Sequence, residues 1–457
     1  MATTKQSILL IIILFLLIGF GIIGLRVSPH IPILLGIIIL ILFGVFKKIP
    51  WSTMEAGIKT GVSAGVPSIF IFLLVGVLIA VWIASGTIPT MMVYGFKLIS
   101  KQFFLAAAFV VCAIVGTSIG SAFTTAATIG IAFMGMGQAL GYEAAWIAGA
   151  VISGAFFGDK MSPLSDTTNL APAVSGVDMF EHIRNMLWTT VPAFILSVLL
   201  FLSLGQPTQN AVNFHVFEKA LRSHATISWV TLLPLLLLFI LAIKKVPAVP
   251  TLLSGIVSGA IIAFTFHPDT SAAGFISIMQ NGYVSSTGVE EIDKLLTRGG
   301  IESMLSSAAL IFLALGMGGL LQKMQIIHQV METISHFVRT TGRLIFSTAM
   351  TAMGINFLLG EQYLSILLTG QAFAGHFDRL GLKRRNLSRV LEDAGTVVNP
   401  LVPWGVSGVF LAGILNVSTI EYIPYTFFCL LCPLITIIVG FTGFGLSRQN
   451  EEPAMKA

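Results

Sequence analysis

Charged residues are scarce in this chain of 457 residues, because Asp, Glu, Lys and Arg together make up only 10% of it. A soluble domain carries about 25% charged residues, so the composition excludes a cytosolic enzyme, a nucleic-acid-binding protein and a disordered chain. The sequence is 55% apolar and has a mean hydropathy of +0.93. It therefore predicts an all-α, multi-pass protein of the cell membrane that contacts the lipid bilayer and binds no nucleic acid.

Cysteine and metal-binding patterns are equally sparse. The three cysteines, Cys112, Cys429 and Cys432, all lie in apolar runs, which disfavours a disulfide framework. Cys429 and Cys432 form a CxxC, but inside a predicted membrane helix we expect them simply to pack. The eight histidines show no HExxH or other metal spacing. We therefore expect no bound cofactor and no enzyme activity.

Apolar stretches are frequent enough for fourteen membrane passes at most. Several are short or rich in Gly, Ser and Thr, so some pairs are expected to form re-entrant hairpins. With a cytoplasmic N-terminus, 17 Lys and Arg residues fall inside, 7 fall outside and Lys160 falls within the membrane region. The positive-inside rule then predicts that both termini are cytoplasmic.

The two halves of the chain share ordered sequence blocks, as transporter repeats do. Pro29 and Pro32 match Pro247 and Pro250 at an offset of 218, and two later blocks match at offsets of 240 and 237. Each half holds seven of the fourteen passes, an odd number, so the second copy should be inverted in the membrane. We expect a first inverted repeat at 1–205, an external linker at 206–226, a second inverted repeat at 227–446 and a cytoplasmic tail at 447–457.

Polar residues interrupt an apolar segment of the first half between Gly154 and Pro172. Charged groups at this depth are costly and mark functional sites, and Pro163 predicts a broken helix. The oxygen-bearing side chains here suit an alkali cation: Asp159, Ser162, Ser165, Asp166, Thr167, Thr168 and Asn169. We expect Na⁺ at Asp166 and its neighbours, with Asp159 either paired to Lys160 or forming a second site. A water-facing loop position is the alternative for Asp166.

The matching segment of the second half supplies Asp393, Thr396 and Asn399 before two prolines. For Asp393 a salt bridge to Arg389 or a helix-capping role is the alternative. Small-residue turns precede both segments and predict hairpin tips, at Ser118, Gly120, Ser121 and Thr124 in the first half and at Gly360 in the second. Glu361, next to Gly360, is a further candidate for the carboxylate that binds Na⁺ or H⁺. Close helix packing is the alternative role of the tip hydroxyls.

The motif GDKMSPLSDTTN at 158–169 resembles the signature of the NhaC family of sodium/proton antiporters, and EDAGTVVNPLVPWG at 392–405 is similar to that family's second-half motif. The resemblance implies inverted repeats, hairpins and broken helices, and exchange of Na⁺ for H⁺ by alternating access. It also implies an alternative, because related transporters carry malate, lactate or amino acids. It assigns no role to Glu361, and the sequence is compatible with a homodimer.

Overall fold

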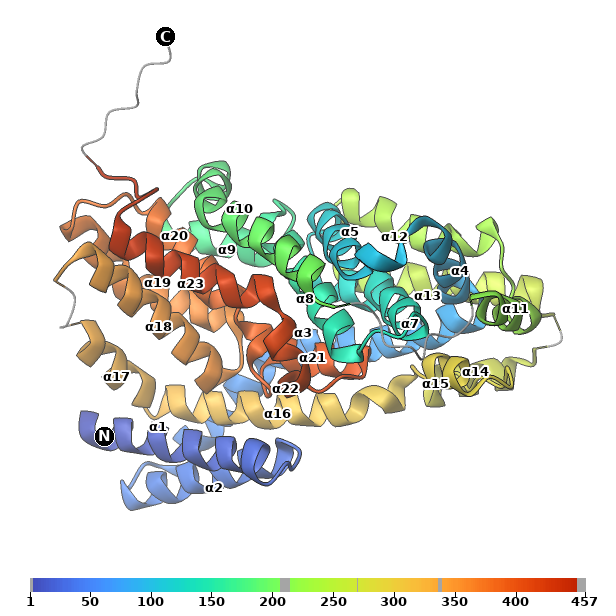
Figure 1. The fold of residues 1–457 in the computed structure, drawn as a ribbon. Helices are drawn as coiled ribbons and strands as arrows, with labels where there is room; N and C mark the ends of the chain where they lie inside the picture. Colours follow the sequence, from blue (N-terminus) through green and yellow to red (C-terminus); the bar gives the residue numbers. More distant parts are fainter. Residues whose placement is uncertain (1–2, 206–213, 269, 336–338, 450–457) are drawn as a thin grey trace, which may run out of the picture.

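The computed structural model describes residues 3–449 except 206–213, 269 and 336–338, and within these ranges the ordered structure is helical apart from two isolated β-bridges (Figure 1). Seven of the described helices are long and apolar enough to cross a membrane, and the number rises to ten if each bent helix pair is one span. The upper limit of fourteen passes is thus reduced, and the expected all-α membrane fold is confirmed.

The first half of the chain is a succession of helices with short connections. In chain order they are α1 (Thr4–Gly19), the π-helical η1 (Phe20–Gly24), α2 (His30–Phe46), α3 (Trp51–Ala84), α4 (Thr87–Leu98), η2 (Lys101–Phe103), α5 (Phe104–Ile119), α6 (Ala122–Thr125), η3 (Ala126–Gly130), α7 (Ile131–Ala139), α8 (Ala144–Met161), α9 (Asp166–Ser175) and α10 (Met179–Ser203).

The second half continues with helices of similar length. They are α11 (Phe214–His224), η4 (Trp229–Leu232), α12 (Leu233–Ile243), α13 (Ala248–Phe266), α14 (Ala272–Asn281), α15 (Glu290–Leu296), α16 (Ile301–Lys323), α17 (Ile326–Ser335), α18 (Thr341–Leu359), α19 (Gln362–Arg379), α20 (Arg385–Leu391), η5 (Glu392–Thr396), η6 (Asn399–Leu401), α21 (Val406–Leu415), α22 (Thr419–Tyr422), η7 (Ile423–Tyr425) and α23 (Phe427–Thr442).

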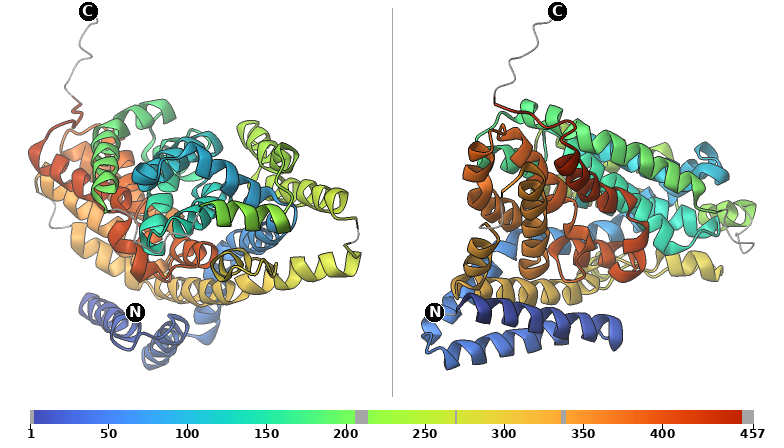
Figure 2. Two further views of the ribbon diagram at one scale, coloured as in Figure 1. Left: turned by 45° about the vertical axis from the view of Figure 1, so that its right-hand side comes forward. Right: turned by 60° about the vertical axis from the view of Figure 1, so that its left-hand side comes forward.

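The long helices α3 and α16 pack closely along their length, because glycines face each other between them. A methyl group added at Gly61 would lie 2.0 Å from the carbonyl oxygen of Leu315, and one at Gly319 would lie 2.1 Å from that of Gly57. Small residues allow such backbone contact between membrane helices. The α1–α2 hairpin lies at the edge of the molecule in both views of Figure 2 and contacts α16 and α17.

Two helix hairpins turn in the same way, α5 into α6 at Gly120 and α18 into α19 at Gly360. Both glycines adopt left-handed backbone angles, with φ of 73° and 68°, which glycine tolerates without steric cost. The next residue caps the following helix in each case, since Ser121 accepts from the Thr124 N–H and Glu361 from the Leu364 N–H. In Figure 1, α5 and α7 lie in the right-hand part of the molecule and α18 in the left-hand part.

Both polar motifs form breaks between helices. Residues 162–165 separate α8 from α9, and residues 402–405 separate η6 from α21, where the helical axis bends by 45°. Pro163 and Pro403 lie in these breaks and cannot donate a backbone hydrogen bond. The expected proline-broken helices are therefore present, whereas the inverted relation of the two halves stays a prediction.

The segments that connect the long helices dock on the helical body. About half of the α4 residues are buried, and α4 packs its Phe96 against Phe217 of α11. Of the expected linker, 206–213 lies outside the described residues and α11 docks on α4, with Lys97 and Glu218 3.1 Å apart. Of the expected tail, 450–457 lies outside the described residues, and 447–449 pairs with residues 381–386.

Candidate ion-binding cavity

A cavity of about 740 Å³ lies where the hairpin tips and helix breaks of the two halves meet. Most of the predicted site residues line it, together with residues of α3 and of the α12–α13 turn. The predicted residues on its wall are Gly120, Ser121, Thr124, Asp159, Ser165, Asp166, Thr167, Asn169, Glu361 and Asn399. The segments that the sequence singled out are thus brought together at one place.

Five of the described α-helices begin at the cavity wall, and two of them carry an acidic residue there. They are α6 at Ala122, α9 at Asp166, α13 at Ala248, α19 at Gln362 and α21 at Val406. The unpaired N–H groups and dipole of a helix N-terminus stabilise negative charge. Asp166 is the first residue of α9 and Glu361 caps α19, so both carboxylates lie at helix N-termini that face the cavity.

Asp159 and Asp166 come from opposite sides of the α8–α9 break and face the same space. Asp159 is 7% exposed at the end of α8, and Asp166 is exposed to the cavity at the start of α9. The two carboxylates are close enough to interact electrostatically, and Ser165 lies close to Asp159. Tyr363 of the second half lies within electrostatic range of both Asp166 and Glu361. Acidic groups from both halves therefore surround one volume.

Other residues of the first motif stabilise the break itself. The Thr168 hydroxyl donates to the carbonyl oxygens of Asp159 and Lys160, at 3.1 and 3.0 Å, and so satisfies the end of α8. The Asn169 amide donates to the carbonyl of Ser165 at 2.6 Å. The Ser162 hydroxyl accepts from the Leu164 N–H at 3.2 Å. Thr168 and Ser162 are fully buried in these roles.

Some of the hairpin-tip residues line the cavity, and others form hydrogen bonds within the protein away from it. Ser121 and Thr124 lie on the cavity wall and hydrogen-bond to each other at 3.1 Å. Ser118 is exposed and turns back to the Ile114 carbonyl of its own helix at 2.9 Å. The carbonyl of Gly360 accepts from the Val406 N–H at 2.8 Å, so the second tip is docked on the start of α21.

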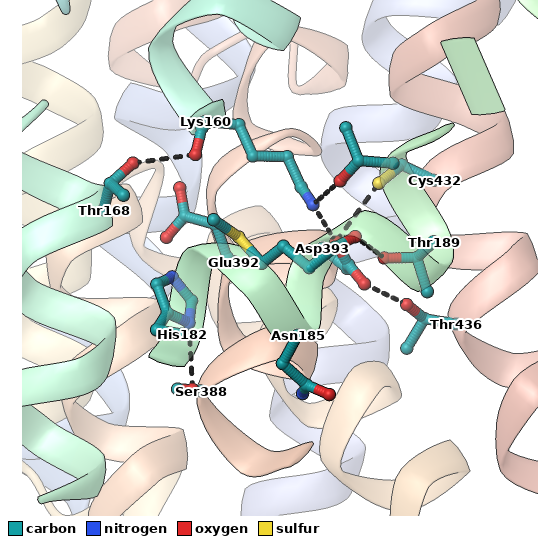
Figure 3. Close-up of polar contacts among 12 residues, drawn as sticks. Lys160, Thr168, His182, Asn185, Thr189, Ser388, Glu392, Asp393, Cys432 and Thr436 are labelled. Carbon is teal, nitrogen blue, oxygen red and sulfur yellow. Dashed lines mark hydrogen bonds and ion pairs between the residues drawn. The ribbon is translucent and has the colours of Figure 1, made fainter. Parts of the chain in front are cut away.

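Lys160 forms a buried ion pair with Asp393, and this differs from both sequence-based alternatives (Figure 3). The sequence places Asp393 among the ion-binding residues, with a salt bridge to Arg389 or a capping role as the alternative, and it offers Lys160 as one partner for Asp159. Instead both side chains are fully buried and join α8 of the first half to η5 of the second. Consecutive side chains of a helix point about 100° apart, so Asp159 faces the cavity while Lys160 points to Asp393.

Residues of α10 and α23 complete the surroundings of this ion pair. Lys160 donates to the Thr190 hydroxyl at 2.6 Å, and Asp393 accepts from the Cys432 thiol at 3.2 Å and from the Thr436 hydroxyl. Neither Thr190 nor Thr436 is recognisable from the sequence, because Thr190 belongs to a Thr pair in an apolar run and Thr436 is a single hydroxyl in another. Cys432 does more than pack, since its thiol contacts a buried carboxylate.

Glu392 lies between the ion pair and the cavity. Its Oε1 accepts a 3.0 Å hydrogen bond from Thr167, which lines the cavity. Glu392 is fully buried and lies within electrostatic range of Lys160 and Asp159. Thr396 is also fully buried, in η5. His182 is buried in α10 and hydrogen-bonds to Ser388 at 2.9 Å (Figure 3).

Comparison with known proteins decides the family. The profile described as "Na+/H+ antiporter family" matches residues 154–444, which contain both motifs and the second hairpin. The chain belongs to this antiporter family. It is 44% identical to the Na⁺/H⁺ antiporter NhaC of Alkalihalophilus pseudofirmus over 452 residues, or 98% of each chain.

Further relatives of this antiporter family member include two proteins of Bacillus subtilis. One is named Na⁺/H⁺ antiporter NhaC and is 42% identical over 91% of this chain and 93% of its own length. The other is named malate-2H⁺/Na⁺-lactate antiporter and is 36% identical over 89% of this chain and 87% of its own. The resemblance to the NhaC family is thereby confirmed over nearly the whole chain.

Proposed function

We propose that this protein is a secondary active transporter that exchanges Na⁺ for H⁺ across the cell membrane by alternating access. The observation that carries the proposal is the cavity in which Asp159, Asp166 and Glu361 meet. Carboxylate, hydroxyl and amide oxygens are the ligands that a hard cation prefers. The names of the two NhaC relatives support Na⁺ and H⁺ as the transported ions. No cofactor is part of the proposal.

Asp166 is the carboxylate that we assign to Na⁺ and H⁺ in turn. It is exposed to the cavity at the N-terminus of α9, with Ser165 and Thr167 hydroxyls beside it. A proton on this carboxylate removes the negative charge that holds Na⁺, and bound Na⁺ disfavours the proton. Exchange follows from this competition when the cavity opens to one side and then to the other.

The position of Lys160 favours a cation as substrate. A fixed ammonium group in the cavity would suit an organic carboxylate, but Lys160 is engaged by Asp393 behind the wall. Among the described residues that line the cavity, Lys245 supplies the one basic side chain, and it lies in the α12–α13 turn. Three acidic side chains against one basic side chain give the cavity a preference for positive charge.

A second candidate function is coupled transport of a small organic acid or an amino acid. Two observations favour it: the volume of about 740 Å³ lies within the usual range for organic ligands, and five α-helix N-termini border the cavity, where helix ends can hold a carboxylate. The malate-2H⁺/Na⁺-lactate antiporter among the relatives supports the same candidate. Malate and lactate are therefore included in the test.

The test uses purified protein in proteoliposomes with an internal pH dye. We expect a Na⁺ pulse to drive proton movement, the rate to fall at low pH, and malate, lactate and amino acids to have no effect. Asp166→Asn should abolish the Na⁺-driven signal, whereas Asp378→Asn, which removes an acid paired with Arg384 away from the cavity, should leave it unchanged. Near-normal exchange by Asp166→Asn would refute the assignment, and a response to an organic solute would favour the second candidate.

A further inference from the structure

The tip of the second hairpin and the start of α21 form a rigid corner of the cavity. The Asn399 amide donates to the carbonyl of Gly360 at 3.3 Å and to the side-chain oxygen of Asn356 at 2.9 Å. The Asn399 side-chain oxygen accepts from the Ser407 N–H at 2.8 Å. Residues Gly360, Asn399 and Ser407 are thus held together by one amide side chain that crosses the break.

Oxygen atoms at this corner are buried and lack hydrogen-bond partners among the described residues. Ser407 is fully buried, and its Oγ has no partner within that part of the chain. Gln362 is 9% exposed, and its Oε1 has none either. Both residues line the cavity. An unsatisfied buried polar atom costs about 1–3 kcal/mol, and in native proteins it often indicates an ion or water that completes the site.

The same hairpin tip also carries a carboxylate. Glu361 is 6% exposed, lines the same cavity and precedes Gln362 in the chain. Its Oε2 accepts from the Leu364 N–H at 2.8 Å, which fixes the side chain over the start of α19. A carboxylate, an amide oxygen and a hydroxyl oxygen at one corner form a ligand set for a monovalent alkali cation.

We infer that the second half of the protein holds its own Na⁺ position, formed by Glu361, Gln362 and Ser407. This inference rests on the proposed function, in which Na⁺ is the cargo. The position is distinct from the one at Asp166, because it is built from α19 and α21 instead of the α8–α9 break. Each half then contributes one Na⁺ to the shared cavity, and the protein binds two Na⁺ ions.

The experiment measures binding of radioactive ²²Na⁺ to the purified full-length protein at saturation, together with the Na⁺ dependence of exchange in proteoliposomes. We expect two ions per chain and a Hill coefficient above one for the wild type. Ser407→Ala and Gln362→Met should each remove one oxygen ligand, raise the Na⁺ concentration for half-maximal exchange about tenfold and lower the Hill coefficient to one.

The matched control is Thr369→Val in the same helix α19. Thr369 is fully buried, and its hydroxyl has no partner among the described residues, but it lies two turns beyond the cavity corner. This variant should keep two ions per chain and wild-type exchange. One Na⁺ per chain in a wild type that still exchanges Na⁺ for H⁺ would overturn the second position alone. Absence of both Na⁺ binding and exchange would overturn the proposed function as well.

Discussion

At the residue scale, the Lys160–Asp393 ion pair gives the strongest prediction on stability. Removal of one partner leaves an uncompensated buried charge, at a cost of about 3–5 kcal/mol. We therefore expect Lys160→Met and Asp393→Asn each to lower the melting temperature of the purified protein strongly. The double variant Lys160→Met/Asp393→Leu should recover much of this loss, because two apolar side chains leave no charge behind.

The exposed pair of Lys59 and Glu55 is the control for this measurement. Its side chains are 73% and 43% exposed, and exposed pairs contribute little to stability. Lys59→Met should leave the melting temperature unchanged. If Lys160→Met were as stable as Lys59→Met, the buried ion pair would not hold the two halves together.

This ion pair also marks the limit of prediction from sequence. The acidic and polar residues of both motifs were identified from their place in apolar segments, and most of them line the cavity. Their partners were not identified, because Lys160 and Asp393 are 233 residues apart and meet only in the folded structure. Adjacency in sequence suggested Asp159 as the partner of Lys160, but the turn of the helix separates these two side chains.

At the element scale, the left-handed glycines of the two hairpins give the second prediction. Gly120→Ala should lower the free energy of unfolding by about 1–2 kcal/mol, because alanine is strained in the left-handed backbone conformation. The loss should be larger than for Gly360→Ala, because the methyl group added at position 120 would also lie 2.6 Å from Leu164 Cβ. The nearest atom at Gly360, the Trp404 carbonyl oxygen, is 3.2 Å away. Thermal unfolding and exchange rates measured on both variants test this order.

Gly354 is the control within the second hairpin. It lies inside α18, and a methyl group there would meet no atom within 4 Å. Gly354→Ala should therefore be neutral, or stabilise the helix by about 0.5–1 kcal/mol. If all three alanine variants lost the same amount of stability, the left-handed backbone conformation would not be the reason for glycine at the two hairpin tips.

Hairpins and breaks were predictable because Gly and Pro restrict the backbone locally, and the local sequence therefore carries the signal. The burial of α4 was not predictable in this way. Its mixture of apolar and charged residues is typical of a membrane-surface helix. The sequence does not show that α11 covers one face of α4, where Phe217 packs against α4.

At the scale of the whole molecule, the ends of the long helices define two sides. Ser52 lies at the start of α3, and the carbonyl of Gly76 near the other end of α3 accepts from the Gly300 N–H at 2.7 Å. The β-bridge from Tyr283 to Arg298 adjoins this contact and places Ser286 at the end opposite Ser52. At a rise of about 1.5 Å per residue, a helix as long as α3 is more than long enough to separate two membrane surfaces.

The excess of Lys and Arg predicts that Ser52 is cytoplasmic, together with both termini, and that Ser286 is external. Cysteine labelling tests this in the native background, because Cys112, Cys429 and Cys432 are fully buried and shielded from an impermeant maleimide. In intact cells, Ser286→Cys should react at once, whereas Ser52→Cys should react only after permeabilisation, and both positions are exposed. The reverse pattern would invert the assigned orientation, and reaction of both positions in intact cells would contradict a span between them.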